Sequence, residues 1–374
     1  MSGIASTVFI RTKLLQPLPP GLGRRRWHII QGWGDLALTV LCLYLIWLIG
    51  WPALKFLLID AVWTGSSRND CLAETTGRDV GACWPFISAK FSQFIYGFYP
   101  ESERWRADLT FFLGAALLLP LLVPRAPYKL ANAVLFFGIF PVVAYFLLVG
   151  GAFGLPYVET RSWGGLLVTL VVAVTGIVAS LPLGILLALA RRSELPALRV
   201  GAVAFIEFWR GVPLVAVLFF ATFMLPLFLP PHWEIDAMLR VLVGVSIFAA
   251  AYMAEVIRGG LQAVPRAQYE GAMALGLSYW KAMGLIVLPQ ALRVSIPGIV
   301  NIFIGLFKDT TLVLTVAIFD LLGQLRAAFA DPNWSSPSTL FTGFAFAGMI
   351  YFLFCFGMSR YSLFLERRLR REHV

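Results

Sequence analysis

Long apolar runs alternate with shorter polar segments along most of this chain. Eight such runs lie near residues 36–58, 107–124, 130–150, 164–190, 212–230, 241–257, 292–320 and 339–360. A helix needs roughly 20 apolar residues to cross a hydrocarbon layer of about 30 Å. Lipid admits only helices or closed barrels, and barrel strands alternate apolar with polar residues, which these continuous runs do not. The sequence therefore predicts an all-α polytopic membrane protein with about eight transmembrane helices.

Composition excludes a soluble globular protein. Hydrophobic residues make up 59% of the 374 residues and charged residues only 13%, and the mean hydropathy is +0.80. The net charge of +10 comes from Lys and Arg at the ends of the apolar runs rather than on one polar face, which argues against a nucleic-acid partner.

The placement of these basic residues predicts the orientation, because Lys and Arg near span ends stay in the cytoplasm. If both termini are cytoplasmic, 20 of the 30 basic residues lie on the inner side: Arg11, Lys13, Arg24, Arg25, Arg26, Arg125, Lys129, Arg191, Arg192, Arg199, Arg210, Arg258, Arg266, Lys281, Arg293, Arg360, Arg367, Arg368, Arg370 and Arg371. We therefore expect a multi-pass protein with both termini in the cytoplasm.

The glycine- and proline-containing stretch 150–156 divides the chain into two parts. Residues 1–155 hold three runs and a large outer loop, residues 156–365 hold five, and residues 366–374 form a basic cytoplasmic tail. Cys71 and Cys83 share the outer loop 59–106, where an oxidising compartment permits a disulfide between them. Cys42 and Cys355 lie inside apolar runs, where a packing role is expected.

A polar segment with turn-forming residues, 258–291, separates the sixth and seventh runs. It carries Glu270-Gly271-Ala272, then Gly276 after three residues and Leu288-Pro289 after eleven more. Glycine allows the positive φ of a helix C-cap, so Gly276 predicts a turn between two short helical pieces. We expect Pro265 to open the first piece and Pro289 to end the second. The small residues Gly271, Ala272 and Ala274 would let a partner approach closely.

This pattern resembles the EAA loop of bacterial ABC importer permeases, with Gly271 where that family usually has alanine. The resemblance implies that the segment inserts into a groove on a separate ATP-binding cassette subunit. The coupling residues would be Glu270, Gly271, Ala272, Gly276, Leu288 and Pro289. The chain has no G-x-x-x-x-G-K-[ST] motif, so ATP and Mg would be used by the partner and this chain would bind no cofactor. It would be a transport subunit rather than an enzyme.

Two further blocks narrow the resemblance to permeases for polar amino acids, such as importers of histidine, glutamine, arginine and glutamate. They are Glu207 to Leu214 (EFWRGVPL) and Lys308 to Leu312 (KDTTL), and the flank 252–261 is also similar to that family. The three leading spans resemble the longer permease subunit of general L-amino-acid transport systems. The resemblance implies import across the bacterial inner membrane in complex with ATPase subunits, a second homologous permease in a heterodimer, and a periplasmic amino-acid-binding protein.

Charged residues inside a span are costly and are therefore candidates for function. Lys308 and Asp309, followed by the hydroxyls of Thr310 and Thr311, could bind the carboxylate and ammonium groups of an amino acid. They are either a substrate site or gate, or an internal ion pair that fixes packing. The pairs Glu207 with Arg210 and Glu255 with Arg258 are three residues apart, so each could pair locally, as a structural brace or as part of a cytoplasmic gate.

Two other classes of protein fit the sequence less well than an ABC importer permease. An ion-gradient-driven secondary amino acid transporter would be expected to contain inverted repeats, and the sequence has no convincing repeat. A membrane enzyme is disfavoured because the three histidines, His28, His232 and His373, lie outside the runs and no H-E-x-x-H or G-x-S-x-G motif is present. No metal site is predicted.

Overall fold

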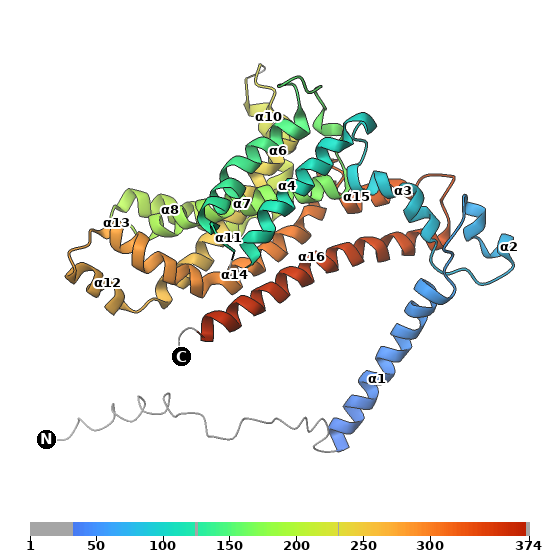
Figure 1. Cartoon of the computed structure of the whole chain (residues 1–374), viewed down its shortest axis with the longest axis horizontal. Coiled ribbons are helices and arrows are strands. Elements are labelled where there is room, and N and C mark those ends of the chain that lie inside the picture. The colour runs from blue at the N-terminus through green and yellow to red at the C-terminus, as the bar shows by residue number, and fades with distance from the viewer. Residues whose placement is uncertain (1–32, 124–125, 231, 372–374) are drawn as a thin grey trace. The chain divides into compact units, whose positions relative to one another are not determined.

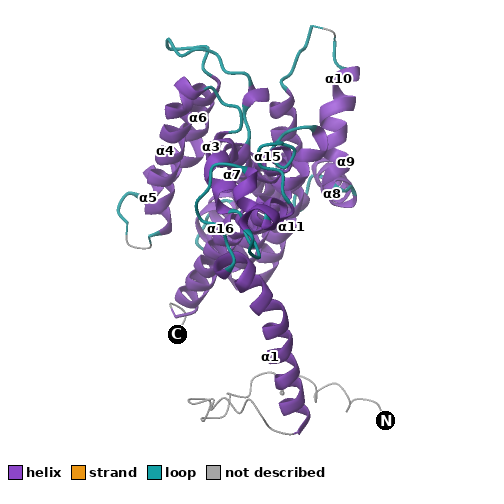
Figure 2. Ribbon diagram, turned by 90° about the vertical axis from the view of Figure 1, so that its right-hand side faces the viewer, coloured by secondary structure: helices purple, strands orange, loops and turns teal. Residues whose placement is uncertain are grey.

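The computed structural model describes residues 33–123, 126–230 and 232–371. This part of the chain is helical, with three isolated β-bridges and no strand of a sheet, as Figure 2 shows. The predicted all-α class is confirmed. The basic residues predicted at the inner end of the first span, from Arg11 to Arg26, lie outside the described residues, as does Arg125.

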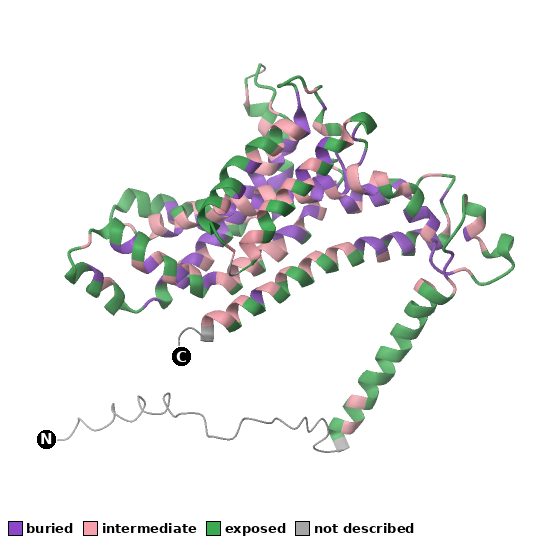
Figure 3. Cartoon of the chain, in the orientation of Figure 1, coloured by how far each residue is buried: buried purple, intermediate pink, exposed green. Residues whose placement is uncertain are grey.

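The chain separates into two units, residues 1–59 and 60–374. The described part of the first unit is one apolar helix, α1 (Trp33–Leu54), which continues as the π-helical turn η1 (Lys55–Ile59). Nearly every side chain of α1 is exposed, as the colouring in Figure 3 shows. Its length and hydropathy make residues 34–59 a candidate membrane span, in agreement with the apolar run at 36–58.

The second unit begins with a loop that contains short helices, followed by α4 and by the continuous helical segment from α5 to α6 (Figure 1). In order, these elements are η2 (Arg68–Cys71), α2 (Ala73–Thr76), α3 (Trp84–Tyr96), η3 (Glu101–Glu103), α4 (Arg104–Leu122), α5 (Lys129–Val134), η4 (Leu135–Ile139) and α6 (Phe140–Val149). Elements α5, η4 and α6 follow one another without a break and pack against α4.

The remaining elements complete the second unit: η5 (Thr160–Ser162), α7 (Gly165–Arg191), α8 (Pro196–Gly211), α9 (Leu214–Phe219), η6 (Phe220–Met224), α10 (Leu225–Phe228), α11 (Ala237–Ala263), α12 (Arg266–Ala274), α13 (Tyr279–Ala282), η7 (Met283–Val287), α14 (Leu288–Asp309), η8 (Thr310–Val316), α15 (Leu321–Ala328) and α16 (Pro337–Arg371). The predicted basic tail from residue 366 is continuous with α16 as far as Arg371.

Seven helices in the described residues are long and apolar enough to cross a membrane, and up to eight if a bent pair counts as one span. The bent pair is α8 with α9–α10, which meet at 102°. The bend lies at Val212-Pro213, where a residue preceding proline is disfavoured in the helical region. The run predicted at 212–230 is therefore a 15-residue helix, Leu214–Phe228, about 22 Å long.

Helices α7 and α11 form the centre of the second unit. They pack closely through small residues: a Cβ added at Gly184 would lie 2.6 Å from the Met253 side chain, and one at Gly176 would lie 3.2 Å from that of Val245. Close approach through small residues is how helices associate in membranes, where apolar burial alone offers little. Helix α11 is the most buried of the candidate spans.

Helices α4 and α6 are fixed to this core across the boundary predicted near residue 155. The Arg106 side chain is fully buried and donates to the carbonyl of Pro156 at 2.9 Å and to the Tyr99 hydroxyl at 2.8 Å. Tyr99 in turn donates to the carbonyl of Leu148 at 2.9 Å. The predicted boundary thus falls inside the second unit, at a point where α4, α6 and the segment leading to α7 share hydrogen bonds.

The loop that contains Cys71 and Cys83 packs on the first turns of α16. The two cysteines form a disulfide with Cα atoms 5.7 Å apart. The Cys83 amide donates to the Thr342 hydroxyl at 2.8 Å, and the Arg68 amide donates to the Asn333 carbonyl at 2.9 Å. The disulfide therefore braces a loop that is itself attached to the last helix.

Candidate functional site

The segment between α11 and α14 forms a helix-turn-helix whose turn is at Gly276. Helix α12 ends in two C-cap hydrogen bonds, from the Gly276 amide to the Met273 carbonyl at 2.9 Å and from the Leu277 amide to the Ala272 carbonyl at 3.2 Å. This pair of bonds is the Schellman arrangement, which places its cap residue in the left-handed region. Gly276 has the predicted positive φ, 74°.

The end of this segment differs from the sequence prediction. Pro265 is the N-cap of α12, but Pro289 does not end a helix: it lies in the first turn of α14, and helical structure is continuous from Tyr279 to Val316. The π-helical turn η7 lies just before Pro289, and in it the Leu288 amide donates to the Met283 carbonyl, five residues back rather than four. The connection between the long helices is thus shorter than the predicted 258–291, running from Val264 to Ser278.

The surface of this helix-turn-helix is polar on one part and openly apolar on another. Glu270 is exposed, and a Cβ at Gly271 would meet no atom within 4 Å. Met273, Leu275 and Trp280 are 61%, 80% and 72% exposed. Ala272, in contrast, is buried by the protein's own helices and is not available to a partner, contrary to the expectation from its size.

An ion cluster lies at the same end of the second unit as α12. The Glu255 carboxylate on α11 is bound by Arg191 at the end of α7 (2.7 Å), by Arg258 one turn along α11 (2.9 Å) and by Arg210 at the end of α8 (3.6 Å). Glu207 pairs with Arg191 at 3.0 Å. We call these five residues the Glu255 cluster.

Of the two glutamate–arginine pairs predicted within single helices, the structure contains one. Glu255 and Arg258 pair within one helix, as their spacing suggested. Glu207 pairs across helices with Arg191 instead of with Arg210, which reaches Glu255. The cluster therefore ties three helices together, with the Glu255 side chain only 16% exposed at its centre.

The segment Lys308 to Thr311 lies where α14 changes into the 3-10 turn η8. Lys308 is exposed and Asp309 is half-buried, and no ion pair joins them in the part of the chain that the structure describes. The Thr310 and Thr311 hydroxyls donate to the carbonyls of Phe307 and Lys308, at 2.8 and 2.9 Å. Consecutive helical residues point about 100° apart, which separates the ammonium from the carboxylate.

Comparison with known proteins decides the family. Residues 180–371, just over half of the chain, match the model of the binding-protein-dependent transport system inner membrane component. The inner membrane amino-acid ABC transporter permease protein YhdY of Escherichia coli K12 is 47% identical, with 92% of this chain and 91% of that protein covered. The chain belongs to the amino-acid ABC importer permease family.

Two further proteins are similar to this chain. The glutamate/glutamine/aspartate/asparagine transport system permease protein BztC of Rhodobacter capsulatus is 40% identical, with 99% of this chain and all of that protein covered. A crystal structure of an amino acid ABC transporter with histidines matches with 29% identity and a TM-score of 0.48, covering 55% of this chain and 92% of that one. This permease is thus a multi-pass inner membrane transport subunit, and its leading spans fall within the part shared with its long relatives.

One polar site in the permease was missed in the sequence. Asp320 is fully buried; its Oδ1 accepts from the Gly323 amide at 2.9 Å and its Oδ2 from the Tyr351 hydroxyl at 2.8 Å. Burial raises the pKa of the Asp320 carboxyl. The signal was available, because an aspartate directly before an apolar helical pattern is a frequent N-cap. Asp320 holds the chain after η8 against α15 and α16.

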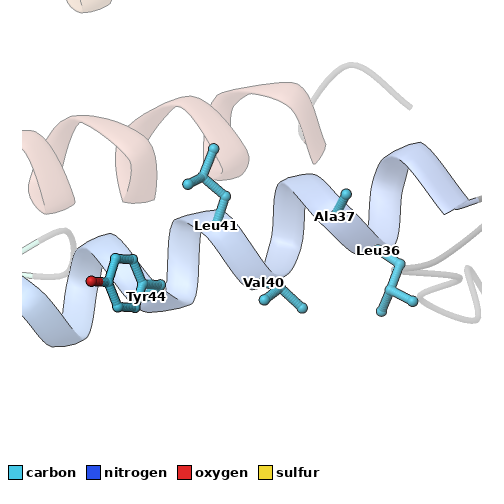
Figure 4. Close-up of a pocket in the computed structure, with 5 residues that line it drawn as sticks. All are labelled: Leu36, Ala37, Val40, Leu41 and Tyr44. Atoms are coloured by element: carbon cyan, nitrogen blue, oxygen red, sulfur yellow. The ribbon is translucent and has the colours of Figure 1, made fainter.

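The cavities of the permease carry little chemistry. A hollow of about 520 Å³ on α1 is lined by Leu36, Ala37, Val40, Leu41 and Tyr44, which Figure 4 shows along one helix. Among the described residues, no group of three or more His, Cys, Asp or Glu side chains is placed to hold a metal ion.

Proposed function

We propose that this permease imports L-amino acids across the bacterial inner membrane, driven by separate ATPase subunits that bind the helix-turn-helix at residues 264–287. The observation that carries the proposal is the exposure of Glu270, Met273, Leu275 and Trp280 around a tight turn at one end of the second unit. Apolar side chains exposed together beyond the ends of membrane helices mark a surface for a protein partner. The names of YhdY and BztC, which transport amino acids, support the substrate class.

The coupling residues divide into two groups by exposure. Glu270 and Gly271 would contact the ATPase directly, because both are exposed and Gly271 leaves open space. Ala272 and Gly276 would act from within, by packing and by turning the chain, and Leu288 and Pro289 would fix the start of α14. ATP and Mg would be used by the partner alone.

The two ends of α7 support the proposed orientation. The amide of Gly165, the first residue of α7, donates to the carbonyl of Phe319, which precedes Asp320, at the end of the unit that carries the disulfide. The last residue of α7, Arg191, belongs to the Glu255 cluster. A helix of 27 residues separates these ends by about 40 Å. A disulfide belongs in an oxidising compartment and clustered arginines in the cytoplasm. The helix-turn-helix would then be cytoplasmic, and so would both termini.

The substrate would pass close to the Lys308–Thr311 segment. Lys308 and Asp309 are not paired with one another in the described residues, so each charge is free to bind the opposite group of a zwitterionic amino acid. The Glu255 cluster would form the cytoplasmic gate, since it joins α7, α8 and α11 through charges that can separate. A second permease would complete the path, in a heterodimer, and a periplasmic amino-acid-binding protein would deliver the substrate.

Uptake of labelled amino acids into vesicles that contain the co-purified complex tests this function. ATP-driven uptake is expected for the wild type and its loss for Glu270→Lys, with the ATPase still co-purifying. Glu74→Lys, the same charge reversal on an exposed residue of α2, should leave uptake unchanged. Uptake that needs no ATPase, or that ignores Glu270→Lys, would contradict the proposal.

A further inference from the structure

We propose that Arg192 and Tyr269 form the link that transmits movement of α12 to the inner end of α7. Tyr269 is then a positioning residue for coupling, distinct from the motif residue Glu270 beside it. This inference rests on the proposed function, since it assigns α12 to the contact with an ATPase.

The contact between Arg192 and Tyr269 joins three helices at one point. The Arg192 guanidinium, at the C-cap of α7, donates to the Tyr269 hydroxyl at 2.8 Å and lies 5.3 Å from the centre of its ring. Both side chains also donate to the Leu261 carbonyl in the last turn of α11, Arg192 at 3.4 Å and Tyr269 at 3.3 Å. A hydrogen bond combined with a cation–π contact fixes both the distance and the orientation of the two groups.

Helix α12 has an inner face and an outer face, and Tyr269 belongs to the inner one. Tyr269 and the buried Ala272 are three residues apart and therefore on the same side of the helix, and Tyr269 is half-buried. Glu270 is exposed on the other side. A partner that pushes on the outer face thus moves Tyr269 against α7.

The adjacent residue of α7 carries the movement further. Arg191 holds Glu255 on α11 and Glu207 on α8, and Arg192 holds Tyr269 on α12. Of two consecutive residues at the end of α7, Arg191 therefore belongs to the Glu255 cluster and Arg192 binds α12. A displacement of α12 that pulls on Arg192 acts on the same turn that closes the cluster.

A second polar contact of α12 leads to a different helix. The Gln290 side-chain amide on α14 donates to Gln268 at 3.1 Å, so this contact joins α12 to the helix that follows it in the chain. Of these two polar contacts in the described residues, the one with Arg192 leads from α12 to α7.

The test measures amino-acid uptake and ATP hydrolysis together in vesicles that hold the complete complex. In Tyr269→Phe, which removes only the hydroxyl, uptake per ATP is expected to fall about tenfold or more, the factor for one lost charge-assisted hydrogen bond. Arg192→Gln should give at least the same fall, and the fall in the double variant should be smaller than the product of the two single falls, because both changes remove the same contact. Tyr279→Phe removes a hydroxyl from α13 in the same segment and should keep the wild-type ratio.

The outcomes separate this inference from the proposed function. A wild type without ATP-driven uptake contradicts the proposed function. A coupled wild type whose ratio is unchanged in both Tyr269→Phe and Arg192→Gln overturns the link, as does an additive double variant or an equal loss in Tyr279→Phe. If the variants instead lose the ATPase on purification, the contact serves docking, and transmission through Arg192 is likewise overturned.

Discussion

Arg191 at the end of α7 lies 2.7 Å from the carboxylate of Glu255, which is 64 residues further along the chain. Arg210 and Arg258 reach the same carboxylate. One carboxylate, only 16% exposed, is therefore shared by three arginines, of which Arg191 also pairs with Glu207.

Replacing Glu255 with glutamine should destabilise the permease by about 2 kcal/mol or more, because three partly buried guanidinium groups lose their shared carboxylate and Arg191 alone keeps a second one, that of Glu207. Thermal unfolding of the purified protein in detergent measures this. Glu207→Gln is the matched control: Glu207 is 55% exposed and pairs only with Arg191, so its loss should cost under about 1 kcal/mol. Equal effects of the two changes would contradict a central role for Glu255.

The disulfide should stabilise the outer loop. Cys71→Ser is expected to lower the free energy of unfolding by about 2–4 kcal/mol, since it frees a loop closed over 12 residues and leaves the attachment of that loop to α16 weaker. Reduction of the wild type should have the same effect. The double change Cys42→Ser and Cys355→Ser, at the two free cysteines, tests whether any loss comes from cysteine chemistry in general.

The ion pair between Lys90 and Asp331 predicts a dependence on pH. The hydrogen bond from Lys90, at 2.5 Å, lowers the pKa of the Asp331 carboxyl. A lowered folded-state pKa contributes stability above the unfolded value of about 3.9, and this contribution is lost as the pH falls through the folded value. Asp331→Asn should therefore be less stable than the wild type by up to about 1 kcal/mol near neutral pH, and the difference should vanish in acid.

Lys90→Met provides the check on that cause. It removes the partner and leaves the carboxyl, which still accepts from the Asn333 amide, so its pH dependence should lie between that of the wild type and that of Asp331→Asn. A pH dependence in Lys90→Met equal to the wild type would show that Lys90 is not the source of the shift.

Asp309 provides a test of the substrate path. Asp309→Asn keeps the size of the side chain and removes its charge, so the KM for amino-acid uptake should rise about tenfold or more, as expected for a charged hydrogen bond to the substrate ammonium. Thr315→Ala, on the exposed side of the same 3-10 turn, should have little effect. An unchanged KM with normal assembly would remove Asp309 from the path.

The sequence predicted the helices and the local features of the candidate site. Apolar runs identify spans because each must supply its own backbone hydrogen bonds in lipid, and the turn at Gly276 and the Glu255–Arg258 pair follow from spacing within a few residues. Pro289 is one local feature that differs: it lies in the first turn of α14, directly after a π-helical turn, instead of ending a helix.

Long-range contacts could not be predicted in this way. Arg192 and Tyr269 are 77 residues apart, and nothing in either local pattern specifies which helix ends meet. The same holds for Glu207, whose partner Arg191 belongs to the preceding helix although Arg210 stood at helical spacing beside it. Which of several arginines a carboxylate binds depends on helix crossing, and crossing depends on small residues such as Gly184 that meet a neighbour only in the packed structure.

Gly276 and Gly271 in the helix-turn-helix serve different purposes: Gly276 allows a left-handed turn, and Gly271 leaves open space beside α12. Gly276 has a φ of 74°, so Gly276→Ala should destabilise the turn by roughly 1–2 kcal/mol, the cost of placing a Cβ in the left-handed region. Gly271 lies inside α12 with open space around it, so Gly271→Ala should stabilise the helix by up to about 1 kcal/mol.

Hydrogen exchange of the amides of residues 266–274 measures both changes, with faster exchange expected for Gly276→Ala and slower exchange for Gly271→Ala. Uptake should fall in Gly276→Ala, because α12 no longer presents Glu270 in a fixed orientation. If Gly271→Ala protects the helix yet lowers uptake, the open space at Gly271 is occupied by the partner, since the change adds only one methyl group to a surface where this chain has no neighbour.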